Sequence, residues 1–182
     1  MKTYNEIKLA QELIRFPTIK TDDKGIMKFL SRKLRSIGFK CTIIRSRGSG
    51  SKPALNLYAR YGNLKPHIMY LGHTDVVTNL DNWKLPPFKA VVSKGYLNGR
   101  GAQDMKGGIA CWISAVSNFV KNNKFKGSIS IIISADEETT GYGCPAVMKY
   151  LRKKGEKIDF SVVGEPSSNK SVGDEIRIGR RG

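Results

Sequence analysis

The chain has 182 residues, 40% of them hydrophobic and 26% charged, which is enough for one domain with a sizeable core and excludes a disordered chain. Its longest apolar runs, such as residues 129–133, are the length of a strand, which excludes a membrane-spanning helix. The net charge of +17 is extreme, but no helix-turn-helix, zinc-finger or aromatic RNA-binding pattern accompanies it, so we favour lysine-rich solvated faces or attraction of a small anionic substrate over a nucleic-acid partner.

The N-terminal region favours two amphipathic helices followed by a strand. Apolar residues fall at helical spacing over residues 4–15, and Pro17 disfavours continuation of that helix. A second helix is expected from a cap at Thr21 or Asp22 to Gly38, where glycine is typical of a helix end. Residues 41–45 then have the composition of a strand.

The rest of the chain alternates between strand and helix. The expected strands are residues 55–61, 68–71, 128–134 and 160–163, and the expected helices are residues 105–121 and 144–154. Residues 128–134 are almost continuously apolar, as expected for a strand covered on both faces. The alternation predicts a three-layer α/β domain with a largely parallel sheet.

The cysteines and the N-terminus bear on the compartment. Cys41, Cys111 and Cys144 are odd in number and have no CxxC spacing. Residues 1–20 lack the apolar stretch and cleavage site of a secretory signal. We therefore expect reduced thiols in a cytoplasmic protein without membrane attachment.

Chemically active side chains follow three of the predicted strands. His73 comes after one strand, Glu137 and Glu138 after the next, and Glu165 after the last. Open α/β sheets bind their ligands at the carboxyl ends of the strands, so these side chains are expected at one edge. Asp104 joins them from a glycine-rich loop, in which glycines permit a close approach to an ion.

Each of these motifs also has an ordinary structural explanation. A lone histidine such as His73 is more often structural than a ligand, and Asp75 fixes an imidazole tautomer or merely caps a turn. Asp104 is otherwise the cap of a helix. The run of Glu137 and Glu138 is otherwise a solvated loop, and Glu165 part of a plain turn.

Taken together, the acidic residues favour a metal site. Six of the 15 acidic residues are predicted at one end of one sheet in a strongly basic chain: Asp75, Asp104, Asp136, Glu137, Glu138 and Glu165. Crowded carboxylates are costly unless cations neutralise them, and Lys106 is the only lysine within these motifs. Oxygen and imidazole ligands suit zinc, cobalt or manganese.

Several segments, spread from residue 13 to the C-terminus, resemble the M20 metallopeptidase family, most closely its bacterial succinyl-diaminopimelate desuccinylase members. They are LIRFPTIKTDD, GHTDVV, NWKLPPF, GRGAQDMKGG, ADEE, VVGEPSS and VGDEIRIGRRG. The GEPSS, GD and GRRG ending favours this branch over acetylornithine deacetylase and the related carboxypeptidases. The resemblance implies a zinc-exopeptidase-like, three-layer α/β/α catalytic domain.

The resemblance also implies roles for individual residues. Two divalent ions, zinc and in some members cobalt, would be bridged by Asp104. His73 and Glu165 would complete one site, and Glu138 would bind the other ion together with a histidine from the family's C-terminal region. Glu137 would be the general base, and Asp75 would orient His73.

The sequence departs from the family at its C-terminus. Residues 1–178 match the N-terminal segment of the catalytic domain, and residues 179–182 match the start of a crossover into a dimerisation domain. The chain has only two histidines, His67 and His73, so the distal ligand is absent. We expect one well-formed metal site, a weaker second one, and an uncovered sheet edge.

The function implied by the resemblance is metal-dependent hydrolysis of N-succinyl-LL-2,6-diaminopimelate to succinate and LL-diaminopimelate, in lysine biosynthesis. The substrate would be a small anionic acyl-amino acid, and the full-length family forms homodimers. The expected form is one half of a split or shortened enzyme that needs a C-terminal half or partner chain. The alternatives are a decayed non-catalytic fragment, another M20 deacylase such as acetylornithine deacetylase, and a basic interaction module.

Overall fold

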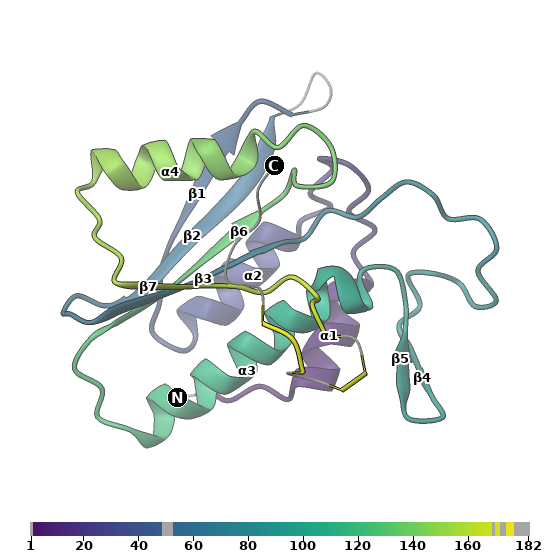
Figure 1. Ribbon diagram of the computed structural model, residues 1–182, viewed down its shortest axis with the longest axis horizontal. Helices are drawn as coiled ribbons and strands as arrows, with labels where there is room; N and C mark the ends of the chain where they lie inside the picture. Colours follow the sequence, from purple (N-terminus) through teal and green to yellow (C-terminus); the bar gives the residue numbers. More distant parts are fainter. Residues whose placement is uncertain (1, 49–52, 169, 172–173, 177–182) are drawn as a thin grey trace.

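A five-stranded sheet forms the centre of the protein, which we describe from a computed structural model for residues 2–48, 53–168, 170–171 and 174–176 (Figure 1). In spatial order its strands are β1 (Lys40–Ser46), β2 (Ala54–Gly62), β6 (Ser128–Ser134), β3 (His67–His73) and β7 (Phe160–Val163). Strands β6, β3 and β7 are parallel neighbours, and β2 is antiparallel to both β1 and β6. Four strands therefore run in one direction, which confirms the predicted largely parallel sheet.

Helices cover both faces of the sheet. Helices α1 (Glu6–Ile14), α2 (Ile26–Arg35) and α3 (Gly107–Asn122) lie on one face, and α4 (Gly143–Lys153) lies on the other (Figure 1). The larger apolar core forms under the first three helices, and a smaller one forms between α4 and the opposite face. All seven residues of β6 are buried, as a strand between two helical layers requires. The predicted three-layer α/β/α architecture is confirmed.

The second helix begins later than the sequence indicated. Its N-terminal cap is Gly25, with φ of 88°, and not Thr21 or Asp22. Asp23 instead organises the turn before the helix, because its carboxylate accepts hydrogen bonds from the backbone N–H groups of Gly25 and Met27. The helical periodicity was sufficient to identify the helix but not its first residue.

A β-hairpin between residues 91 and 98 was not predicted. Its strands are β4 (Val91–Ser93) and β5 (Tyr96–Asn98). The two residues between them, Lys94 and Gly95, both have positive φ, the geometry of the tight turns that suit the twist of a hairpin. The signal in the sequence was Gly95 between two short apolar pairs. The hairpin projects from the body beside the loop over residues 77–90 (Figure 1).

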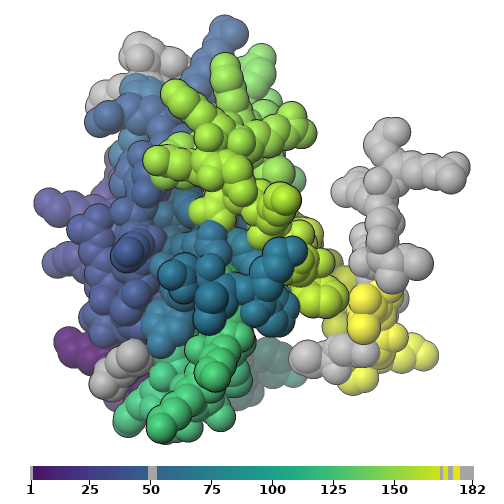
Figure 2. All heavy atoms as spheres, turned by 90° about the vertical axis from the view of Figure 1, so that its left-hand side faces the viewer, coloured from purple at the N-terminus to yellow at the C-terminus, as the bar shows by residue number. Residues whose placement is uncertain are grey.

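Strand β7 is an exposed edge of the sheet. Phe160, Val162 and Val163 keep 64%, 42% and 57% of their surface exposed. Figure 2 shows the segment that follows, in yellow, standing away from the body. The expected uncovered edge is present, and association through it stays a prediction. The predicted crossover at residues 179–182 lies outside the described residues. No helix in the described part of the chain is long and apolar enough to cross a membrane.

Candidate metal centre

The ends of three parallel strands bring the predicted site residues together. In the ladder between β3 and β6, His73 pairs with Ser134, and residues 136–138 follow directly. In the ladder between β3 and β7, Leu71 pairs with Val163, two residues before Glu165. The shared direction of the strands therefore places the imidazole and the carboxylates at one edge.

Asp104 reaches the same edge through a break in helical geometry. A short π-helical turn, η1 (Ala102–Lys106), precedes α3, and within it Asp104 has extended backbone angles (φ −117°, ψ 97°). The next peptide bond, to Met105, is cis. At Gly107 a Cβ would collide with the carbonyl oxygen of Ala102, so only glycine permits this tight turn. The alternative of Asp104 as a helix cap is wrong, because the cap of α3 is Lys106.

His73 is the centre of the resulting group. Its Nε2 atom lies 3.0 Å from Asp104 Oδ1, 3.6 Å from Glu165 Oε1 and 4.0 Å from Glu137 Oε2. Ligand atoms of His73, Asp104 and Glu165 all lie within 4.8 Å of one another, and so do those of His73, Glu137 and Glu138. The first trio is the set expected for one ion. The second places Glu138 near His73, a proximity that the sequence did not predict.

The charges of this group are strongly coupled. Burial raises the pKa of Glu137, and the carboxylates of Glu165, Asp75 and Asp104 raise it further, while His73 opposes them. Burial would lower the pKa of His73, but hydrogen bonds and charge from Asp75 and Glu165 raise it to about 11. The hydrogen bond with His73 in turn lowers the pKa of Glu165. One imidazolium thus faces several carboxylates.

The donor set fits a divalent metal. Among the described residues, His73 is the only cation within ion-pairing distance of Asp104, Glu137 or Glu165. One imidazole nitrogen with two or three carboxylate oxygens is a ligand set typical of zinc. The negative charge that the protein leaves uncompensated here is what a divalent cation would neutralise.

Asp75 connects His73 to the loop that carries Glu138. The side chain is buried, and its Oδ1 lies 3.5 Å from His73 Nδ1. Its Oδ2 accepts a hydrogen bond of 2.8 Å from the backbone N–H of Glu138. The geometry fits the proposed orientation of the imidazole. The second contact was not foreseen, and it means that Asp75 positions residues of both ligand trios.

Asp136 belongs to the loop and not to the ligand group. It accepts hydrogen bonds from the hydroxyl groups of Thr139 and Thr140 and from the backbone N–H groups of Thr140 and Tyr142. Burial would raise the pKa of Asp136, but these hydrogen bonds lower it. Its inclusion in the predicted acidic group is therefore wrong, because its oxygens are occupied in shaping the loop after β6.

Two hollows flank the ligand group. One of about 260 Å³ is lined by Glu137 and Glu165 on the polar side and by Cys144 and Val163 among others. The other, of about 340 Å³, is lined by Asp104, Glu138, Trp83 and Arg100 among others. Sequence analysis named no role for Trp83 or Arg100, although both lie in the NWKLPPF and GRGAQDMKGG segments.

Comparisons with known proteins agree with this geometry. Residues 69–179 match the family described as peptidase family M20/M25/M40. The chain is 53% identical to a succinyl-diaminopimelate desuccinylase of Pelagibacter ubique, over 100% of this chain and 48% of the relative. It is 47% identical to one of Ehrlichia canis, over 97% and 47%. The chain thus spans about half the length of these curated relatives.

Solved structures support the fold. Human carnosine dipeptidase 1 superposes with a TM-score of 0.73 at 22% identity, over 87% of this chain and 37% of that one. An M20 family metallo-carboxypeptidase from Sulfolobus solfataricus gives a TM-score of 0.72 at 20% identity, over 89% and 37%. The matched segment, the relatives and the shared fold lead to one conclusion: the chain belongs to the peptidase family M20/M25/M40.

Proposed function

We propose that this chain is the metal-binding half of an amide hydrolase that cleaves N-succinyl-LL-2,6-diaminopimelate to succinate and LL-diaminopimelate. The observation that carries the proposal is the meeting of His73, Asp104 and Glu165 beside Glu137 at the carboxyl ends of parallel strands. The names of the relatives support the substrate.

Each side chain has a defined task in this proposal. His73, Asp104 and Glu165 would hold one zinc ion, and Asp104 and Glu138 would contribute to a second, with cobalt as an alternative metal. When bound, the metal would polarise the scissile carbonyl and lower the pKa of the attacking water. Asp75 holds the His73 ring in place through Nδ1.

Glu137 is suited to move the proton. Its side chain is 55% exposed and its carboxylate lies 4.0 Å from His73 Nε2, so it borders both the ligand group and the open hollow. Burial and neighbouring carboxylates raise its pKa toward the range in which a carboxylate accepts and returns protons. It would take a proton from the attacking water and deliver it to the leaving amine.

The isolated chain is expected to bind one zinc ion tightly and a second one much more weakly. The first trio supplies three protein ligands, the number of a catalytic zinc site. The second site lacks the histidine that the family resemblance assigns to the C-terminal region, and both trios share His73. Zinc titration by calorimetry measures the stoichiometry. Two equivalent tight sites would contradict this ligand assignment.

Desuccinylation is expected only when the chain is mixed with the C-terminal half of a full-length relative such as that of Pelagibacter ubique. That half would supply the second-site histidine, the dimer interface and the remaining substrate contacts. Glu137→Gln should lower kcat of the mixture by about 100-fold or more, because it removes the proton carrier. Glu12→Gln is the matched control, since Glu12 pairs with Lys33 on the helical layer.

The assay also separates the alternatives. Succinyl-diaminopimelate turned over by the mixture, with acetylornithine left intact, supports the proposal. Turnover of acetylornithine alone would assign the chain to a different deacylase. A mixture that associates and binds two zinc ions but cleaves neither substrate would contradict the proposed activity.

A further inference from the structure

The larger hollow beside the ligand group carries a positive charge that the smaller one lacks. Asp104 and Glu138 line one side of this 340 Å³ hollow, and Arg100 and Trp83 line another. The residues that line the 260 Å³ hollow include neither lysine nor arginine. The two sides of the ligand group therefore offer different environments to the two halves of a substrate.

Arg100 is held in a fixed position. Its Nη2 donates a hydrogen bond to the carbonyl oxygen of Asn79, and its guanidinium carbon lies 5.1 Å from the centre of the Trp83 ring. Its backbone N–H donates to the carbonyl oxygen of Pro87 at 2.7 Å. Stacking on an aromatic ring restrains a guanidinium without neutralising its charge.

The two glycines that flank Arg100 fix its backbone. A Cβ at Gly99 would lie 2.6 Å from Ile14 Cγ2, and a Cβ at Gly101 would lie 2.9 Å from Val76 Cγ1. Gly101 also has φ of +79°, which favours glycine. The close packing on both sides means that Arg100 projects from a rigid turn, as a binding group should.

The charge of Arg100 is not balanced by the protein. In the part of the chain that the structure describes, Arg100 forms no salt bridge, although Asp104 and Glu138 line the same hollow. Its Nε–H is buried without a hydrogen-bond partner among the same residues. A guanidinium presents five N–H donors and pairs with carboxylates through two parallel hydrogen bonds.

The position of Glu137 decides which half of the substrate enters this hollow. Glu137 lines the smaller hollow, and in the proposed reaction it returns a proton to the leaving amine. The amine must then lie on that side, within hydrogen-bond reach of Glu137. The acyl group consequently extends to the opposite side, toward Trp83 and Arg100.

We propose that Arg100, supported by Trp83, binds a carboxylate at the end of the acyl chain and so selects amides of dicarboxylic acids. This inference rests on the proposed function, because the orientation of the substrate follows from the role of Glu137. The apolar side chains of Val76 and Val77 line the same hollow and would contact the methylene groups of such a chain. A simple acetyl group would leave Arg100 without its anionic partner.

Succinate and butyrate, which differ by one carboxylate, test the inference on the zinc-loaded chain. The chain has two tryptophans, and Trp112→Phe leaves Trp83 as the only fluorescent indole. In that background we expect succinate to quench the fluorescence of Trp83 with an affinity at least about 10-fold higher than butyrate, since only succinate reaches Arg100 with its second carboxylate. Arg100→Gln should abolish this preference, and Arg100→Lys should keep only part of it.

Lys84→Gln is the matched control, because it removes one positive charge from the same loop but lines a different hollow. It should leave the preference for succinate unchanged. A folded Arg100→Gln or Arg100→Lys protein that binds zinc normally and keeps the full preference would overturn the role of Arg100. Failure of the parent chain to bind zinc would instead overturn the proposed metal function, so the two failures are distinguishable.

Discussion

Replacement of Asp104 by alanine is expected to lower the affinity of the chain for its first zinc ion by at least about 100-fold, more than the loss typical of an outer-shell partner. The Oδ1 atom of Asp104 is 3.0 Å from His73 Nε2, the shortest of the distances from that nitrogen to the surrounding carboxylates. Removal of this carboxylate leaves two protein ligands, His73 and Glu165, in the first trio. Competition with a zinc-binding dye measures the change.

The control for Asp104→Ala is Asp81→Ala. Asp81 is an exposed aspartate in the loop after β3 and lines neither hollow of the ligand group. Its replacement changes the net charge equally and should leave the zinc affinity within about 2-fold. Equal losses in both variants would mean that general electrostatics, and not coordination, governs zinc binding.

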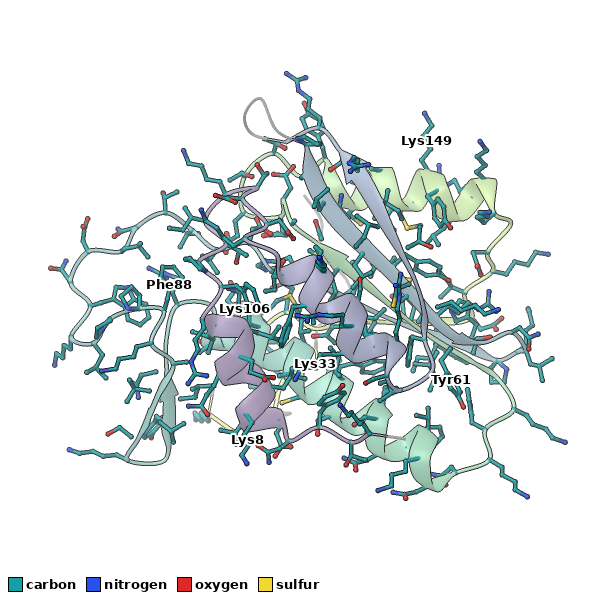
Figure 3. All side chains as sticks on the ribbon, turned by 180° about the vertical axis from the view of Figure 1, so that it is seen from behind. Lys8, Lys33, Tyr61, Phe88, Lys106 and Lys149 are labelled. Carbon is teal, nitrogen blue, oxygen red and sulfur yellow. The ribbon has the colours of Figure 1, made fainter. Side chains whose placement is uncertain are left out.

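Replacement of Lys106 by alanine is expected to lower the free energy of unfolding by roughly 3–5 kcal/mol. Lys106 is fully buried beside the end of α1 (Figure 3), and its Nζ donates a hydrogen bond of 2.8 Å to the carbonyl oxygen of Phe16. Alanine would leave a cavity and an unpaired carbonyl. Lys149 on α4 points away from the body in the same view, so Lys149→Ala is the matched control and should have little effect.

The pH dependence of Lys106→Met tests the same side chain. Burial lowers the pKa of Lys106 from 10.5 to about 7, although the charge of Asp75 opposes this. Between these two pH values the unfolded chain binds more protons, so the contribution of Lys106 to stability rises with pH in this window. Methionine keeps the volume but does not titrate. The wild-type free energy of unfolding should therefore rise relative to that of Lys106→Met from pH 7 to 10, as urea denaturation would measure, and parallel profiles would contradict the shift.

Most of the sheet and its helices could be predicted from periodicity, because their apolar residues face a buried core. Strands β6 and β7 have the predicted bounds, residues 128–134 and 160–163. The hairpin β4–β5 was missed because its residues are mostly exposed and its strands have only three residues each. For such short strands the turn residues give the main signal, and Lys94-Gly95 is a weaker signal than Asn-Gly.

The candidate site could be predicted only where strands determine position. His73 and Glu165 follow directly from the direction of neighbouring strands. Asp104 was placed by its glycine-rich loop, but the extended backbone inside η1 has no counterpart in sequence periodicity. Asp136 could not be separated from Glu137 and Glu138 by sequence alone, because the donors that occupy it lie within the following turn.

The exposed edge of the sheet gives the ligand group two parts that differ in local stability. His73 ends a strand that has hydrogen-bonded neighbours on both sides, whereas Glu165 follows β7, which pairs only with β3 and is exposed at every residue. Local opening is easiest where few apolar groups are buried, so Glu165 is attached to the part of the sheet that opens first. The readiness of the site for metal is thus set by the fraying of one strand, and any chain that pairs with β7 would also steady a zinc ligand.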